Sequence, residues 1–112
     1  MPGFAFSIPV IAGKEALDRR TLDEMLGDRR DEYEAALRRA GITRQVVWHQ
    51  TTPDGPVAVV YVEAEDPEAG LAQFASSTAP LNAWFREQMK EVHGVDIARA
   101  ELRAAKVHDI QL

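Results

Sequence analysis

The sequence predicts a single α+β domain, residues 1–112, in which helices cover one face of an antiparallel sheet. The chain has 112 residues, of which 46% are hydrophobic and 28% are charged, and these values fit one globular domain. Short segments that are typical of β-strands occupy residues 4–11, 42–51, 57–64 and 107–112. Segments with the apolar spacing of amphipathic helices occupy residues 14–40, 66–75 and 80–93.

The first strand and the first helical segment each contain residues that limit them. Pro9 has no N–H for a strand ladder, so we expect the strand at 4–11 to lie at an edge of the sheet or to end near Pro9. Gly27 interrupts the helical pattern and is followed by Asp28, a favourable N-cap residue. We therefore expect either one helix weakened at Gly27 or two helices that meet there. Gly41 lies just past the last periodic residue and is expected to end the segment.

The second and third strands are predicted to form a β-hairpin, because the turn sequence TTPDGP at 51–56 joins them. The third strand is apolar on both faces: one face carries Val57, Val59 and Tyr61, and the other carries Ala58, Val60 and Val62. A strand with two apolar faces is expected to be covered on both sides.

A helix pair and a tail follow. Asp66 and Pro67 are the N-cap and first-turn residues of the first helix, and Gly94 ends the second. Residues 95–106 have no decisive pattern, and both helix and loop remain open for them. The segment VHDIQL at 107–112 alternates and is predicted to be a fourth strand.

The order of these elements is βαββαβ, which is the ferredoxin-like plan with a four-stranded antiparallel sheet. Helices on one face leave the other face of the third strand uncovered, and a chain of this length has no further layer to supply. A second copy of the chain is the simplest cover, with sheet packed on sheet about a twofold axis. The sequence therefore predicts a homodimer that is joined through its two sheets.

The composition argues against several classes of protein. The net charge is −5, and the arginine pairs at 19–20, 29–30 and 38–39 lie among carboxylates, which argues against a nucleic-acid partner. No apolar run reaches the roughly 20 residues that cross a bilayer, and the alternating N-terminus is typical of a strand and not of a signal peptide. The chain has no cysteine. We therefore expect a cytoplasmic protein without a membrane or nucleic-acid partner.

The sequence contains no motif for a metal or a tightly bound cofactor. Its three histidines lack the spacing of metal ligands. No glycine-rich phosphate loop, G-x-S-x-G motif or cysteine nucleophile is present. We therefore expect neither a metal nor a cofactor. Haem ligation by a single histidine is a weaker option, which a visible absorption band would reveal.

Three stretches carry a resemblance to a known group: GITRQVVWHQ at 41–50, VVYVEAEDPEAGLAQF at 59–74 and WFREQMKEVHGVD at 84–96. With the element order and the two-sided strand, they resemble the dimeric α/β-barrel superfamily and a small bacterial family within it. The superfamily includes antibiotic-biosynthesis-type monooxygenases, dehalogenase-like and decarboxylase-like proteins, polyketide cyclases and stress-responsive proteins. The resemblance implies the fold, a homodimer and a range of functions, and it assigns no catalytic residue.

Two histidines are candidate acid–base groups, because imidazole titrates near neutral pH. His49 lies on the second strand and either points into a cavity or is a hydrogen-bonded histidine near the strand end. His93 lies directly before Gly94 in the last turn of a helix, where a cation interacts favourably with the carbonyl groups. Asp96 lies just beyond and could orient the His93 imidazole, as a carboxylate does in a catalytic pair.

Five further residues are candidate ligand contacts: Arg30, Tyr33, Trp48, Tyr61 and Trp84. Arg30 interrupts an apolar helical stripe and could bind a carboxylate or an enolate; the alternative is an exposed ion pair with a neighbouring carboxylate. The tyrosine hydroxyls could bond a ligand oxygen or a partner in the core. The tryptophans either line a pocket or fill the interior.

Two functions remain open at this point. The first is a homodimer that binds a small apolar or aromatic organic molecule, as a cofactor-independent cyclase or monooxygenase with His93 or His49 as the acid–base group. The second is a non-enzymatic dimeric binding or stress-related module, in which side chains fill the barrel. A void of about 300 Å³ or more with converging histidine and arginine side chains favours the first.

Overall fold

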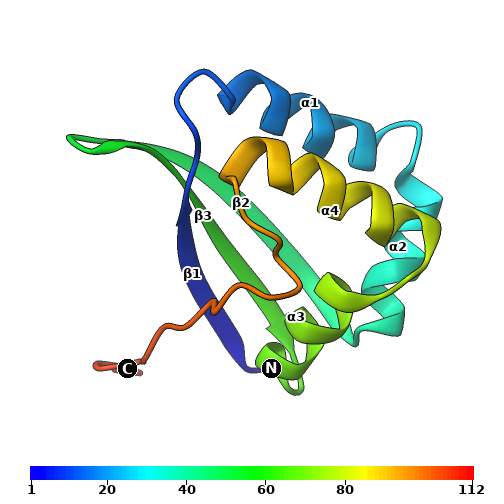
Figure 1. Cartoon of the computed structure of the whole chain (residues 1–112). Coiled ribbons are helices and arrows are strands. Elements are labelled where there is room, and N and C mark those ends of the chain that lie inside the picture. The colour runs from blue at the N-terminus through cyan, green and yellow to red at the C-terminus, as the bar shows by residue number, and fades with distance from the viewer.

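The computed structural model describes residues 1–112, and the chain forms three strands and four helices (Figure 1). Their order is β1 (Gly3–Pro9), α1 (Glu15–Leu26), α2 (Arg30–Arg39), β2 (Ile42–Thr52), β3 (Gly55–Ala64), α3 (Pro67–Ser76) and α4 (Pro80–His93). The four helices lie on one side of the sheet, and no element lies on the other (Figure 1). The predicted α+β class is confirmed, and the arrangement is compatible with a ferredoxin-like fold.

The sheet is antiparallel, with strand order β1–β3–β2, so both predicted edge and hairpin relationships are confirmed. The register places three rows of side chains toward the helices. These rows are Phe4, Val62 and Gln45; Phe6, Val60 and Val47; and Ile8, Ala58 and His49. Two polar side chains of β2 therefore face the helix layer, in a sheet face that is otherwise apolar.

The predicted fourth strand is absent, so the sheet has three strands and not four. Residues 107–112 make no ladder, and Val107 is 92% exposed. The segment before them passes around the β1 edge, where Ala104 and Lys106 lie beside Gly3 and Tyr61. The tail therefore leaves the sheet without running along β1 (Figure 1). Alternation marks a segment that can pair, but it does not supply the partner strand.

The long helical segment is divided into α1 and α2 at Gly27, so the expectation of two helices that meet there is confirmed. The expected N-cap at Asp28 is wrong: Arg29 occupies that position, and no side chain caps the helix. The backbone turn satisfies two of the donors at this helix start, because Arg29 N–H bonds the Glu24 carbonyl and Arg30 N–H bonds the Gly27 carbonyl.

Other helix ends follow the sequence. Asp66 caps α3 by accepting a hydrogen bond from Ala69 N at 3.2 Å, and Pro67 occupies the first turn. Gly94 ends α4 with a φ of 73°, a left-handed conformation that costs glycine little. These caps fix where α3 and α4 begin and end over the sheet.

The core consists of two apolar clusters between the helices and the sheet. One cluster contains Met25, Ala36, Ile42, Val60, Val62, Ala64, Phe74 and Leu81. The other, nearer the end of α4, contains Ile8, Val10, Ala58, Met89 and Val92. The uncovered face of the sheet carries Val46, Trp48, Val57, Val59 and Tyr61. No helix is long and apolar enough to cross a membrane.

Candidate functional site

The most distinctive polar contact in the helix layer joins α1 to β2. His49 Nε2 lies 2.7 Å from Asp18 Oδ2, and the two side chains are 20% and 3% exposed. Burial of a carboxylate is costly unless it is paired, and His49 is the partner that the fold supplies. The pair is thus held by a strand on one side and a helix on the other.

Asp18 is buried because of its place on α1. Asp18, Leu22 and Met25 fall at i, i+4 and i+7, which is the stripe that faces the sheet. His49 faces them because β2 pairs with β3 in the register that sets it opposite Ala58. Helical and strand periods therefore bring together two residues 31 positions apart.

The hydrogen bond to Asp18 determines which ring nitrogen of His49 carries the proton. An ionised carboxylate only accepts hydrogen bonds, so Nε2 carries the proton and donates to Asp18. Nδ1 has no hydrogen-bond partner, and the one buried side-chain polar atom without a partner is Asn82 Oδ1. His49 Nδ1 is therefore open to solvent. In the neutral imidazole, Nδ1 is an acceptor that can take a proton.

A second polar pair lies on the same face of β2, four residues before His49. The Tyr33 hydroxyl of α2 donates to Gln45 Oε1. Burial raises the pKa of Tyr33 to about 12, so the phenol stays protonated and remains a donor at neutral pH. The Gln45 amide Nε2 has no hydrogen-bond partner in the chain and remains a free donor.

Two cavities meet at these pairs. An outer cleft of about 350 Å³ is lined by His49, Tyr33 and Arg19, together with apolar side chains. An inner cavity of about 70 Å³ is mainly apolar, and Asp18 lies on its wall. The wall that the two cavities share consists of Leu22, Met25, Gln45 and Val47. The Asp18–His49 hydrogen bond therefore lies on the boundary between an open cleft and an apolar interior.

This arrangement supplies the parts of an acid–base site. His49 Nδ1 can accept a proton, and the Asp18 carboxylate stabilises the imidazolium that results. Gln45 Nε2 is a donor for a ligand oxygen. Arg19, on the rim of the cleft, forms no ion pair with the chain and is free to face an anion.

His93 has a different environment from the one expected. Its Nδ1 lies 2.8 Å from the carbonyl oxygen of Pro9. The His93 side chain also lies on the wall of the inner cavity. The expected pairing with Asp96 is absent. Asp96 instead accepts a hydrogen bond from Ala98 N at 3.0 Å and lies 3.9 Å from Arg99. The chain turns at Gly94, and this turn directs Asp96 into a local cap of the following residues.

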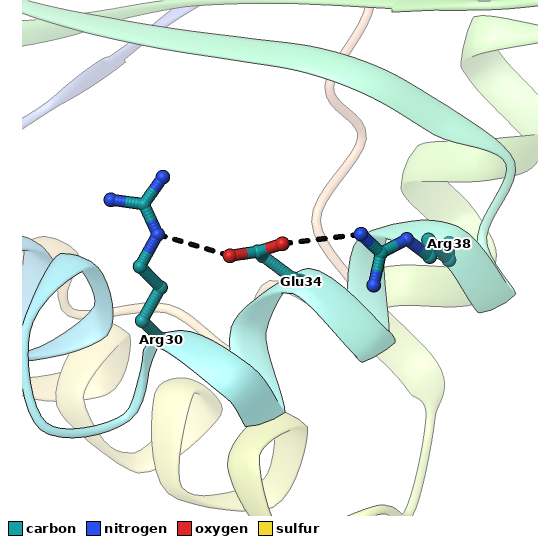
Figure 2. A network of polar contacts seen from close by, with 3 residues as sticks. All are labelled: Arg30, Glu34 and Arg38. Carbon is teal, nitrogen blue, oxygen red and sulfur yellow. Dashed lines mark hydrogen bonds and ion pairs between the residues drawn. The ribbon is translucent and has the colours of Figure 1, made fainter.

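Arg30 lies on the exposed side of α2 and not on the wall of either cavity. Its Nε bonds Glu34 Oε2 at 3.0 Å, and Arg38 bonds the other Glu34 oxygen at 3.2 Å. Figure 2 shows Glu34 between the two guanidinium groups. Both arginines lower the pKa of Glu34, Arg30 more than Arg38. Of the two roles expected for Arg30, the structure therefore shows the exposed ion pair with a neighbouring carboxylate.

The aromatic candidates divide among three places. Tyr33 lines the outer cleft. Trp84 of α4 packs against the core, and the Arg29 guanidinium lies 4.4 Å from the centre of its ring. Trp48 and Tyr61 lie on the uncovered face of the sheet, and Trp48 is 53% exposed. The structure therefore brings together His49 and Tyr33, while the other three lie elsewhere.

Asp18, Gln45 and Arg19 belong to the site but were not singled out from the sequence. Asp18 carried a usable signal, because it is an acidic residue within the apolar stripe of Leu22 and Met25. Gln45 carried the same kind of signal, since it shares a strand face with Val47 and His49. Arg19 carried none, because it belongs to a pair of arginines among carboxylates.

No group of three or more histidine, aspartate or glutamate side chains is placed to hold a metal ion. Comparison of the chain with protein-family models, with curated proteins and with solved structures gave no significant match.

Proposed function

We propose that the protein binds a small apolar or aromatic organic molecule and removes a proton from it, with His49 as the base. The observation that carries the proposal is the 2.7 Å contact between His49 and the buried Asp18 at the boundary of an apolar cavity. A histidine oriented by a carboxylate beside a mainly apolar pocket is the arrangement that general-base catalysis needs.

The proposed step moves a proton from an acidic C–H or O–H of the ligand to His49 Nδ1. The electron pair of the broken bond stays on the ligand as an enolate or phenolate. Gln45 Nε2 and the Arg19 guanidinium face the negative oxygen, and Asp18 holds the imidazolium through Nε2. Return of the proton to the ligand restores the neutral histidine.

Two reaction classes begin with this step and need no cofactor. Attack of the carbanion on a carbonyl group of the same molecule gives a cyclisation. Reaction of the carbanion with dioxygen, as a second substrate, gives an oxygenation. Both agree with the reactions that the dimeric α/β-barrel resemblance implies. The outer cleft of about 350 Å³, with His49 and Arg19 on its wall, lies near the lower end of the roughly 300–1,000 Å³ of ligand sites.

The proposal is tested with 2-tetralone, an aromatic ketone with acidic C1 hydrogens. We expect the protein to exchange these hydrogens for deuterium in D₂O faster than imidazole buffer at the same concentration, as followed by proton NMR. His49→Phe should lose the acceleration, and His93→Phe should keep it. Exchange no faster than in buffer, or an equal rate in His49→Phe, contradicts the role of His49.

The second candidate function is a non-enzymatic binding module. It is favoured by the small volume of the inner cavity, about 70 Å³, and by the position of the Asp18–His49 pair between α1 and β2. In this function the pair holds the helix on the sheet and the cleft binds a ligand without turnover. Binding of 2-tetralone without accelerated exchange of its C1 hydrogens would distinguish this function.

We also propose that two copies of the chain associate through the uncovered face of the sheet. Val46, Val57, Val59 and Tyr61 are only partly exposed there, and Trp48 projects from the centre of β2. Sheet-on-sheet packing would remove these side chains from water. Sedimentation equilibrium should give twice 12.4 kDa, and Trp48→Glu should give a monomer. Arg39→Glu, at an exposed arginine of α2 that forms no ion pair, is the matched control.

A further inference from the structure

The inner cavity is closed at one end by the segment that follows α4. Ile97 and Leu102 line the cavity and pack against the core cluster that includes Ile8 and Met89. Between them the chain has neither helix nor strand and is held by a turn in which Arg99 N and Ala100 N bond the Asp96 carbonyl. Figure 1 shows this segment crossing from the end of α4 toward the β1 edge.

Three polar residues line the inner cavity, Asp18, Gln45 and His93, and the other 14 of its 17 lining residues are hydrophobic. His93 Nδ1 is already bonded to the Pro9 carbonyl, so Asp18 and Gln45 are the polar groups on the side of the outer cleft. The cavity thus runs from the Asp18–His49 pair to Ile97 and Leu102 with little in its wall that can bond a polar ligand group. A ligand whose head lies against His49 can enter it only with an apolar tail.

We infer that the ligand has an acidic or carbonyl-bearing head and an unbranched apolar tail, and that Ile97 and Leu102 set the length of that tail. This inference rests on the proposed function, which places the head at His49. A volume of about 70 Å³ holds roughly two or three carbons, since a group the size of water occupies about 30 Å³. Longer tails meet Ile97 and Leu102.

For such a tail to pass, the side chains in the wall between the two cavities must move. Leu22 and Met25 form part of this wall, and Met25 is 1% exposed in the core. Methionine is a flexible side chain that adapts to irregular apolar contacts. Gln45 is held on its oxygen by Tyr33, so the polar edge of the passage stays in place while the apolar edge adjusts.

The test measures the affinity of 4-alkylphenols by isothermal titration calorimetry, from phenol to 4-hexylphenol. The phenolic hydroxyl is the head that His49 accepts from, and the alkyl group is the tail. We expect the affinity of the wild-type protein to rise about fourfold per added carbon up to about three carbons and then to stop rising. His49→Phe should weaken every member of the series.

Variants of the closing segment should move this limit. Ile97→Ala and Leu102→Ala remove carbons from the end of the cavity. Each variant should therefore bind 4-hexylphenol about tenfold more tightly than the wild-type protein does, while the affinity for 4-ethylphenol changes little. Ile97→Phe should shorten the preferred tail. Arg99→Ala, on the exposed side of the same segment, is the matched control and should leave the series unchanged.

The outcomes separate the inference from the function beneath it. A wild-type protein that binds the series with the same length dependence as the Ile97 and Leu102 variants overturns the inference and leaves the proposed function standing. A wild-type protein that binds no 4-alkylphenol overturns both. Because Ile97→Ala and Leu102→Ala open the core and could unfold it, Ile97→Val provides a milder variant, for which a smaller shift in the same direction is expected.

Discussion

His93 Nδ1 lies 2.8 Å from the carbonyl oxygen of Pro9, which joins the last residue of α4 to the last residue of β1 across 84 positions of the chain. A carbonyl oxygen only accepts, so Nδ1 carries the proton. The neighbouring Ile11 N–H bonds the Val92 carbonyl at 2.8 Å and reinforces the same corner. The two histidines near the core therefore have different partners: a backbone carbonyl for His93 and a buried carboxylate for His49.

Removal of the His93 imidazole is expected to destabilise the protein without affecting the proposed chemistry. His93→Ala loses one hydrogen bond and a favourable group in the last turn of α4, and we expect the free energy of unfolding to fall by about 1–2 kcal/mol. Urea denaturation measures the change. His108→Ala, in the exposed tail, is the control and should be neutral. A loss of 2-tetralone exchange in folded His93→Ala would contradict the structural role.

Asp18 and His49 are expected to be energetically coupled. His49→Ala leaves a carboxylate buried without a partner, which should cost about 1–3 kcal/mol of stability. Asp18→Ala removes that charge, so the double variant should be more stable than the sum of the single changes predicts, by about 0.5–3 kcal/mol. A double-mutant cycle from urea denaturation gives this value. Additive effects would show that the two groups do not interact.

Tyr33 is expected to make the stability of the protein depend on alkaline pH. Burial raises its pKa from 10.0 to about 12, so the fold favours the neutral phenol. This stabilising contribution is complete below pH 10, the ordinary value in the unfolded chain, and is lost as the pH rises toward 12. Stability measured in this range should fall less steeply in Tyr33→Phe.

The absorbance of tyrosinate checks the same group directly. The chain has two tyrosines, and the pKa of Tyr61 is also raised, first by burial and then by Glu63. In Tyr33→Phe only Tyr61 remains, so the difference between the two titrations belongs to Tyr33. Ionisation of Tyr33 near pH 10 in the folded protein would contradict its burial between α2 and β2.

A methyl group added at Gly70 is expected to disturb the contact between α3 and the end of α2. A Cβ atom at this position would lie 2.8 Å from the Ala40 carbonyl oxygen, which belongs to the backbone and cannot turn away. Alanine gains about 1 kcal/mol over glycine inside a helix, but overpacking costs about 1–3 kcal/mol. We therefore expect Gly70→Ala to lower the melting temperature.

The control for this change is Gln73→Ala on the exposed side of the same helix. It should be neutral or slightly stabilising, because alanine has a high helix propensity. A Gly70→Ala variant that is as stable as Gln73→Ala would indicate that α3 and α2 lie farther apart than the structure places them.

The sequence determined the local elements because their signals are local. Period-two segments became β1, β2 and β3, the turn at 51–56 joined a hairpin, and Gly27 divided a helical segment. Each depends on residues within a few positions of one another, and the same holds for Asp66 and Gly94 as helix ends. The prediction of a fourth strand at 107–112 was wrong for the converse reason. A strand must pair with another strand, and the local sequence does not determine whether one lies beside it.

Tertiary structure alone decided which polar residues meet. The sequence indicated that His49 was a candidate, but the choice of Asp18 as its partner depends on how α1 sits over β2. Likewise His93 bonds the Pro9 carbonyl and not the nearby Asp96, because the chain turns at Gly94 and Asp96 bonds Ala98 N instead. Burial selects such pairs, since a polar group in the interior must take whichever partner the packing of distant elements supplies.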